Sequence, residues 1–253
     1  MPELFELPVE GQPGERYWVL WGASGVYIIG QFDGRTFTPE TPKLQNHNGT
    51  AYAAQCYNNI PATDGRVIKV AWARIDFDGA PFNGTMLLPQ QQRLCRTPQG
   101  LRLMSRPVEE TDRLFTTVLR RDSLSADEAN DLLRPFAAND HLRIRARLQL
   151  TYATDASLSY RGQKLLDYNL NGNYLNGAFY VNPYDPTSLT LDLDCYIDGP
   201  VVEWYVDGGA FASSLKRDLR SRTPEGYLFR GNHLQVTSLE VATHGDVGCR
   251  VKT

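Results

Sequence analysis

The sequence predicts an all-β protein with about two propeller-type blades and a β-sandwich, joined by a short helical linker. Nine Asp-Gly or Asn-Gly pairs punctuate the chain, and such pairs tolerate the positive φ angles of tight hairpins. Between them lie short runs rich in β-branched and aromatic residues, as at residues 17–21, 26–29 and 67–72. Many short strands separated by regular turns are typical of propellers, sandwiches and barrels.

The first part of the chain is assigned to two blades, over residues 1–106. Residues 3–40 and residues 51–107 each accommodate four strands, which is the make-up of one propeller blade. Two blades do not close a propeller, so this assignment leaves the blades without a complete ring.

A linker is predicted over residues 107–135, where the sequence becomes charged and loses its glycine and aromatic content. Ser125 and Glu128 have the spacing of a capping box, which predicts that a helix begins there. Ala129, Leu132 and Leu133 supply an apolar face. Pro135 is expected to end the helix.

A sandwich is predicted over residues 136–253, because strict alternation begins at residue 142. Apolar side chains occupy every second position of 142–150, and the positions between them carry Arg143, Arg145, Arg147 and Gln149. This pattern predicts a strand with one face in a core and the arginines in water. A nucleic-acid-binding stripe is the disfavoured alternative, because no aromatic side chains interleave the arginines.

Composition and charge exclude several classes of function. The formal charge of −3 lacks the concentrated positive charge of a nucleic-acid-binding protein. No apolar stretch approaches the roughly 20 residues of a membrane span, so no membrane partner is expected. Residues 1–7 lack the basic start and apolar core of a signal peptide, which predicts a cytoplasmic protein if Met1 is the natural start.

No active site is evident from the residues alone. The sequence carries no HExxH, Walker or dinucleotide-binding motif, and we expect no metal or cofactor. The i,i+2 carboxylate pairs Asp76/Asp78 and Asp192/Asp194 lie too close along one strand to flank a scissile bond. The four cysteines are expected to be free and buried, since none has CxxC spacing: Cys56, Cys95, Cys195 and Cys249.

The order of several short motifs resembles glycoside hydrolase family 32, which comprises invertases, levanases, inulinases and other β-fructosidases. PELFELP at 2–8 resembles the region after the family's Glu-Cys-Pro motif. Collinear with it are YWVL (17–20), GQFDG (30–34), YAAQ (52–55), NIP (59–61), DGR (64–66), VAW (70–72), PFNGTMLLP (81–89), CYID (195–198) and VEWYVDGG (202–209).

This resemblance implies a five-bladed propeller joined to a β-sandwich, and it exposes missing catalytic motifs. The family's Trp-Met-Asn-Asp-Pro-Asn-Gly motif, which carries the nucleophile, and its Arg-Asp-Pro motif are absent from residues 1–253. Met1 occupies the Cys position of Glu-Cys-Pro, so the general acid/base glutamate would precede it. Glu3 stands two positions further on, a shift of roughly 6–7 Å along a strand, and is a poor substitute.

Tyr52 and Trp72 lie in matching motifs that approach the sugar pocket in the family, which makes them the candidate substrate-binding residues. Packing in a core is the competing and favoured interpretation, because large aromatic side chains dominate cores. The polar residue that often precedes Tyr-Ala in the family is an Asp, and here residues 46–50 read NHNGT. That polar contact is therefore expected to be altered or lost.

These observations lead to one functional hypothesis and one alternative. The chain is predicted to be the carboxy-terminal part of a β-fructosidase-like glycoside hydrolase for sucrose, levan or inulin, a homologue of retaining glycosidases that is inactive by itself. The alternative is a non-enzymatic carbohydrate-binding or structural sandwich module. Uncovered blade faces predict self-association, or docking of an upstream chain, through residues 1–106.

Overall fold

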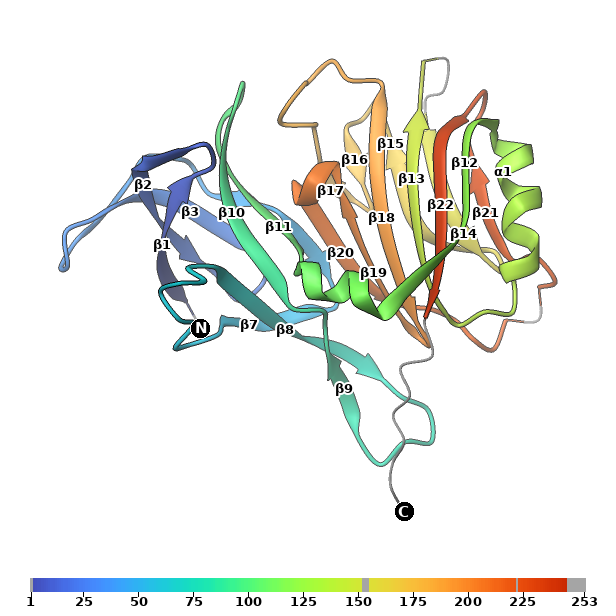
Figure 1. Cartoon of the computed structure of the whole chain (residues 1–253), viewed down its shortest axis with the longest axis horizontal. Helices are drawn as coiled ribbons and strands as arrows, with labels where there is room; N and C mark the ends of the chain where they lie inside the picture. Colours follow the sequence, from blue (N-terminus) through green and yellow to red (C-terminus); the bar gives the residue numbers. More distant parts are fainter. Residues whose placement is uncertain (1, 152–154, 222, 245–253) are drawn as a thin grey trace. The chain divides into compact units, whose positions relative to one another are not determined.

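The chain folds into two units in the computed structural model, which describes residues 2–151, 155–221 and 223–244 (Figure 1). Unit 1 comprises the chain up to Val108 together with Ala178–Ser188 and Glu203–Lys216. Unit 2 comprises Glu109–Gly177, Leu189–Val202 and the chain from Arg217. Both units are built almost entirely of strands, so the predicted all-β class is confirmed.

Unit 1 is organised around a ten-stranded sheet with the order β4-β3-β2-β1-β10-β8-β7, and β11, β5 and β9 pair with β10, β3 and β8 (Figure 1). A short parallel pair, β6 with β20, also lies in this unit. The elements of unit 1 are β1 (Glu3–Val9), β2 (Gln12–Trp21), β3 (Val26–Phe32), β4 (Phe37–Pro39), β5 (Leu44–Gln45), β6 (His47–Gly49), β7 (Ala51–Cys56), β8 (Val67–Asp76), β9 (Asn83–Met86), β10 (Gln90–Thr97), β11 (Gly100–Pro107), β17 (Ala178–Phe179), η3 (Asp207–Gly209) and β20 (Phe211–Lys216).

Residues 3–40 contribute four strands to this sheet, as predicted, whereas residues 51–107 contribute five, because β9 also pairs with β8. Strands β1–β4 pair antiparallel in chain order, and β7, β8, β10 and β11 form a second antiparallel group. The groups are joined where Val9 pairs with Leu94 in a parallel bridge between β1 and β10. The two groups of strands therefore belong to one continuous sheet.

Unit 2 contains two sheets, which Figure 1 shows as two layers. One has the order β12-β22-β13-β18, and the other contains β16-β15-β14-β21. The elements are η1 (Glu109–Leu114), β12 (Phe115–Ser125), α1 (Ala126–Leu133), η2 (Arg134–Phe136), β13 (His141–Gln149), β14 (Asp155–Tyr160), β15 (Gln163–Asn169), β16 (Tyr174–Leu175), β18 (Thr190–Asp198), β21 (Tyr227–Arg230) and β22 (Gln235–His244), with β19 (Val201–Val206) leading from unit 2 into unit 1.

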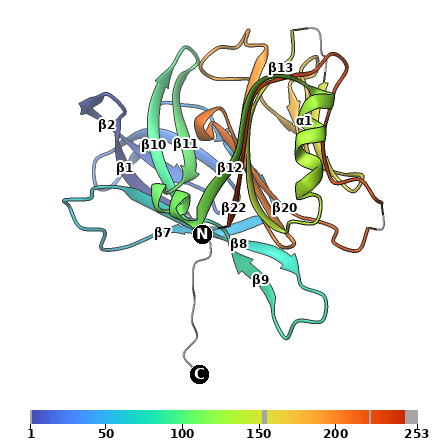
Figure 2. The same ribbon diagram turned by 45° about the vertical axis from the view of Figure 1, so that its right-hand side comes forward.

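Helix α1 begins at the predicted capping box and lies against β21 and β22 (Figure 2). Ser125 Oγ accepts a hydrogen bond from Glu128 N at 3.2 Å, and Glu128 Oε2 accepts one from Ser125 N at 2.8 Å. The α-helix ends at Leu133, before Pro135, and Pro135 itself lies in the 3-10 turn η2 that follows directly. Among the described residues no helix is long and apolar enough to cross a membrane.

The predicted linker contains a strand that the sequence analysis missed. Residues 115–125 form β12, an eleven-residue strand that pairs antiparallel with β22. Eight of its eleven side chains are exposed and none is buried, so the strand is held by backbone pairing rather than by a buried face. Periodicity alone does not reveal such a strand.

The alternating segment after the linker forms β13, with its apolar side chains buried as predicted. The arginine face differs from the prediction, because Arg143 is only 5% exposed and bonds Glu240 Oε1 at 2.9 Å. Arg145 and Arg147 lie opposite acidic residues of β18 in the sheet register. Their Nε atoms lie 3.0 Å from Asp194 Oδ2 and 2.6 Å from Asp192 Oδ1, respectively. The solvated-face prediction is therefore wrong for Arg143, and the acidic pair is engaged by arginines.

Three of the Asn-Gly and Asp-Gly pairs do not form hairpin turns. Asn48-Gly49 lies in β6, Asn83-Gly84 in β9 and Asp207-Gly208 in η3. Gly49 has φ +86°, and a Cβ there would meet Ser214 O at 2.0 Å. In this strand the glycine is required by the close approach of a neighbouring backbone rather than by a turn.

A continuous chain of hydrogen bonds runs through the interior of unit 1. Its side chains come from the β5–β6 connection, β10, β11 and β19, and successive donor–acceptor distances lie between 2.7 and 3.2 Å. It ends where Glu203 Oε1 accepts a hydrogen bond from Leu88 N at 2.9 Å. Buried polar groups linked in this way specify one arrangement of their strands. Its members are Asn46, Ser105, Gln92, Gln90, Tyr205 and Glu203.

Lys69 on β8 is a buried cation in the same unit. Its side chain is 2% exposed, and Nζ lies 3.7 Å from the ring centroid of Trp21. Burial lowers the pKa of Lys69 to about 7, and the negative charge of Glu3 opposes that shift. His47 is also buried, and burial lowers its pKa to about 3.

Replacing Lys69 by methionine tests the cost of this buried amine. In the unfolded chain the lysine pKa is about 10.4, so between pH 7 and 10 the unfolded state binds more protons and stability rises with pH. We expect Lys69→Met to raise the free energy of unfolding at pH 6 by roughly 2–4 kcal/mol, and to flatten the rise between pH 7 and 10. Chemical denaturation at several pH values measures both effects. The exposed Lys43→Met is the matched control, and parallel pH curves for the parent and Lys69→Met would contradict the expectation.

Candidate functional site

Three neighbouring strands of unit 1 place Tyr52, Trp72 and Met86 in one row, which we call the β7–β9 row. Tyr52 of β7 lies directly opposite Trp72 of β8, and Trp72 lies directly opposite Met86 of β9. Residues opposite each other in antiparallel strands project from the same face of a sheet. The three side chains are 42%, 39% and 58% exposed, respectively. They therefore form an accessible apolar surface.

The sequence of β8 explains why this face is open. Ala71, Ala73 and Ile75 alternate with Trp72 and Arg74, and the first three are buried while the last two are exposed. The small apolar side chains face the core, so the indole of Trp72 shares the outer face with a charged residue. The favoured sequence interpretation, that Tyr52 and Trp72 pack in a core, is therefore wrong.

Gly84 of β9 provides the space that the Trp72 indole occupies. Gly84 has φ +76°, and a Cβ built there would lie 1.9 Å from Trp72 Nε1. The indole consequently lies across the β9 backbone at this glycine. On the other side of the row, the Arg74 guanidinium carbon is 4.8 Å from the centroid of the Tyr52 ring. Such a cation–π contact holds the phenol ring in place.

The sequence analysis did not identify Met86, Arg74 or Gly84 as members of this surface. The signal for Arg74 was present, because the period-2 pattern of β8 places it on the same face as Trp72. Met86 and Gly84 become neighbours of Trp72 only through the pairing of β9 with β8. No spacing within the chain predicts that register.

The carboxylates considered in the sequence analysis are engaged elsewhere. Both carboxylate oxygens of Glu3 lie 2.9 Å from Cys56 N, and Cys56 lies at the opposite end of β7 from the row. Glu6 pairs with Arg16 at 2.7 Å. Asp78 lies in the turn after β8, where Lys216 Nζ is 3.7 Å from its Oδ2. The row thus offers apolar and aromatic faces rather than an acid–base pair.

The polar residues that precede Tyr52 do not join the row. Asn46 and His47 are buried in unit 1, and Thr50 Oγ1 lies 2.9 Å from Ser214 Oγ. Among the described residues no group of three or more His, Cys, Asp or Glu side chains is placed to hold a metal ion.

The three described cysteines form no disulfide, as predicted, although Cys56 is only partly buried. Burial raises the pKa of Cys56 to about 12 and that of Cys95 to about 11, which keeps both thiols protonated at neutral pH. Cys95 Sγ donates a hydrogen bond to Glu10 Oε2 at 3.0 Å. Cys249 lies outside the described residues.

Comparison with known proteins supports the family resemblance. No protein-family model matches the chain. It is 26% identical to a levanase of Bacillus subtilis over 95% of its own length and 42% of the levanase. It is 25% identical to an extracellular exo-inulinase of Aspergillus niger over 85% of its own length and 48% of that enzyme.

Solved structures agree with these relatives at the level of the fold. The exo-inulinase from Aspergillus awamori superimposes with a TM-score of 0.74 and 15% identity, over 96% of this chain and 56% of that one. Fructan 1-exohydrolase IIa from Cichorium intybus gives a TM-score of 0.69 and 14% identity, over 96% and 61% of the two chains. The chain thus spans about half the length of the relatives it matches.

Replacing Gly84 by alanine tests the placement of the Trp72 indole. A methyl group there meets Trp72 Nε1 and also forces an L-residue into positive φ, so we expect the indole to move outward. Acrylamide quenching of tryptophan fluorescence should increase, with a loss of about 1–3 kcal/mol in stability. Gly79→Ala is the matched control, because Gly79 has φ +79° but no atom within 4 Å of its added Cβ. Equal quenching in the two variants would contradict this geometry.

Proposed function

Because the chain is a β-fructosidase-like relative of glycoside hydrolase family 32 along nearly its whole length, we propose that the β7–β9 row binds fructosyl units of a sucrose- or fructan-type carbohydrate. The exposure of Tyr52 and Trp72 on one face is the observation that carries the proposal. Aromatic faces pack against the C–H faces of sugars and bury apolar area there. The names of the relatives, levanase and exo-inulinase, support a fructan as the ligand.

The proposal includes the architecture that the family resemblance implies. Strands β1–β4 and strands β7, β8, β10 and β11 are the two propeller-type blades of residues 1–106, and their antiparallel pairing supports this assignment. The sandwich of this architecture is unit 2 with its two layers, and the predicted linker of residues 107–135 contributes β12 to one of the sandwich sheets, so the proposed sandwich differs from the predicted range 136–253. A structure of the protein with a bound fructan tests this assignment together with the site.

The proposal also holds that residues 1–253 bind but do not hydrolyse the sugar. Retaining hydrolysis needs an attacking carboxylate and a second carboxyl group about 5 Å away. The family's two aspartate motifs are absent from residues 1–253, and the Glu3 carboxylate is occupied by the backbone of β7. This combination supports binding without turnover.

Titration of the 253-residue protein with inulin oligosaccharides tests the site, with heat and tryptophan fluorescence as readouts. We expect saturable binding, weakened about tenfold or more in Trp72→Ala and Tyr52→Ala, because each loses an aromatic face. Tyr174→Ala is the matched control, since Tyr174 is an exposed tyrosine of unit 2. Absent binding, or equal affinity in the Trp72→Ala variant, would refute the binding site.

Assays of the same protein with sucrose, levan and inulin measure turnover separately. We expect no release of fructose above the blank. Turnover well above the blank would refute the absence of hydrolysis while leaving the binding result intact. Affinity unchanged in both aromatic variants would instead favour the alternative, a carbohydrate-binding surface on the sandwich.

The same face is proposed to mediate self-association through residues 1–106. The β7–β9 row places three exposed apolar side chains on neighbouring strands, and contiguous patches of this kind mark interaction sites. We expect the mass in analytical ultracentrifugation to rise with concentration, and Met86→Glu to keep the protein monomeric. A strictly monomeric parent protein at every concentration would contradict self-association.

A further inference from the structure

An arginine occupies an unfavourable position in the hairpin that connects β14 and β15. Tyr160 pairs with Gln163, and the two residues between them, Arg161 and Gly162, have φ +47° and +81°. Positive φ at both central residues defines a type I′ turn, for which Asn-Gly is the preferred sequence. The chain uses that sequence at Asn176-Gly177, where φ is +47° and +79°. Arginine is therefore conformationally disfavoured at position 161 of this turn.

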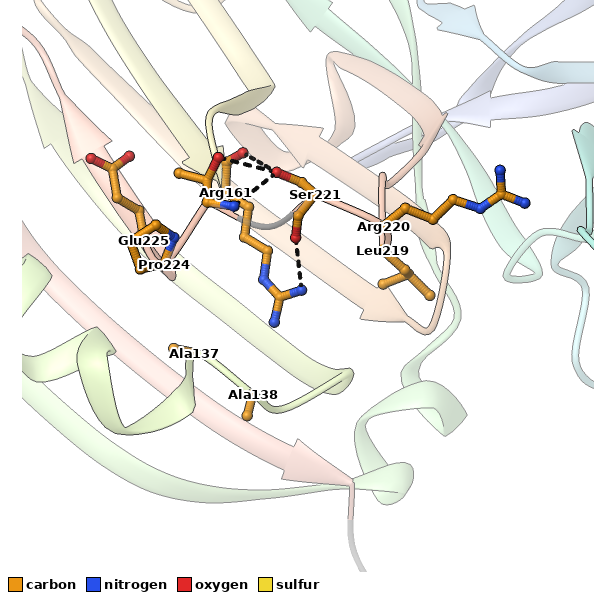
Figure 3. Close-up of a pocket in the computed structure, with 9 residues that line it drawn as sticks. Ala137, Ala138, Arg161, Leu219, Arg220, Ser221, Pro224 and Glu225 are labelled. Carbon is orange, nitrogen blue, oxygen red and sulfur yellow. Dashed lines mark hydrogen bonds between the residues drawn. The ribbon is translucent and has the colours of Figure 1, made fainter.

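The side chain of Arg161 extends into a cavity on the surface of unit 2 (Figure 3). The cavity has a volume of about 560 Å³, which lies in the range of small-molecule sites. Its walls come from the loop after η2, the β14–β15 turn, and residues 219–221 and 223–225 before β21. Besides Arg161, the lining includes Ala137, Ser221, Thr223, Pro224 and Glu225.

The walls of this cavity are tied together by short-range contacts. Ser221 Oγ donates to Arg161 O at 3.0 Å, which fixes the turn against the facing segment. A Cβ added to Gly226 would lie 2.6 Å from the Ala137 Cβ, so the two chain segments touch at that point. In the same unit, Arg217 is fully buried and bonds Asp140 Oδ1 at 2.6 Å and Gly199 O at 2.7 Å.

Arg161 differs from Arg217 and Arg230 in its partners. Arg217 is paired with Asp140, and Arg230 is paired with Glu225 at 2.9 Å. The Arg161 Nη1 atom donates to Ser221 O at 3.3 Å, and the guanidinium carbon lies 5.1 Å from the Tyr160 ring centroid. No carboxylate of the described residues forms an ion pair with it. Several of its donors, and its positive charge, are therefore left for a ligand.

We propose that this cavity is an oxyanion site, in which the Arg161 guanidinium binds the carboxylate or phosphate group of a sugar-sized ligand. The planar donor fork of arginine matches both groups by paired hydrogen bonds. Glu225 does not repel the anion, because Arg230 neutralises its carboxylate. The Thr223 hydroxyl and the apolar surfaces of Ala137 and Pro224 line the space for the rest of the ligand. This site lies in unit 2 and is independent of the β7–β9 row.

The test titrates the full 253-residue protein with inorganic phosphate, glucuronate and glucose at low ionic strength, by calorimetry. We expect saturable binding of phosphate or glucuronate, none of glucose, and weaker binding as salt is added. The anion that binds more tightly identifies the group that the site recognises. Failure of both anions to saturate would overturn the proposal.

Arg161→Asn is the decisive variant, because asparagine suits the type I′ turn and removes the guanidinium. We expect at least a tenfold loss of anion affinity, with a melting temperature equal to or above that of the parent. Arg35→Asn removes the same charge from an exposed turn of unit 1 and should bind as the parent does. Parent-like affinity in Arg161→Asn would overturn the proposal.

A second variant covers the case in which Arg161→Asn does not fold. Arg161→Lys keeps the charge but lacks the planar fork, so we expect it to bind the anion severalfold more weakly than the parent. Affinity equal to the parent's would show that the fork does not hold the ligand, and would overturn the assignment to Arg161.

Discussion

The pairing of β8 with its neighbours is the constraint on which unit 1 and its surface depend. β8 pairs with β7, β9 and β10, so three other strands take their register from it. Its alternation places Ala71 and Ala73 in the core and Trp72 outside. A one-residue slip would exchange these faces, burying a charged residue and exposing the core. The apolar surface and the packed interior are therefore two consequences of one register.

The interior of unit 1 contains several buried polar side chains. The hydrogen-bonded chain from Asn46 to Glu203 and the buried cation Lys69 both lie inside it. Burying such groups costs free energy unless their partners are in place. The hydrogen bonds offset that cost in part, because the amide oxygens of Asn46 and Gln90 are buried without a hydrogen-bond partner among the described residues. Lys69 has the ring of Trp21 as its neighbour instead, which is a weaker compensation for a desolvated charge.

In unit 2 the buried and half-buried arginines of β13 are paired with carboxylates. The arginines of β13 face the acidic residues of β18 and β22 across the sheet, so the register that buries one face also pairs the charges on the other. Arg217 is likewise enclosed by acceptors. Arg161 stands apart from this pattern, because it is held in a turn that disfavours it and faces a cavity rather than a carboxylate. A residue kept at a conformational cost is often one that serves a ligand.

By itself the sequence determined the features that depend on neighbouring residues: the all-β class, the capping box at Ser125, and the apolar face of β13. These follow from local propensity and from the two-residue period of a strand. Only the tertiary structure decided that residues 115–125 form a strand, that Arg143 is buried, and that Trp72 lies open beside Met86. Each of these depends on which distant segment lies alongside, because pairing register and burial are set by partners far away in the chain.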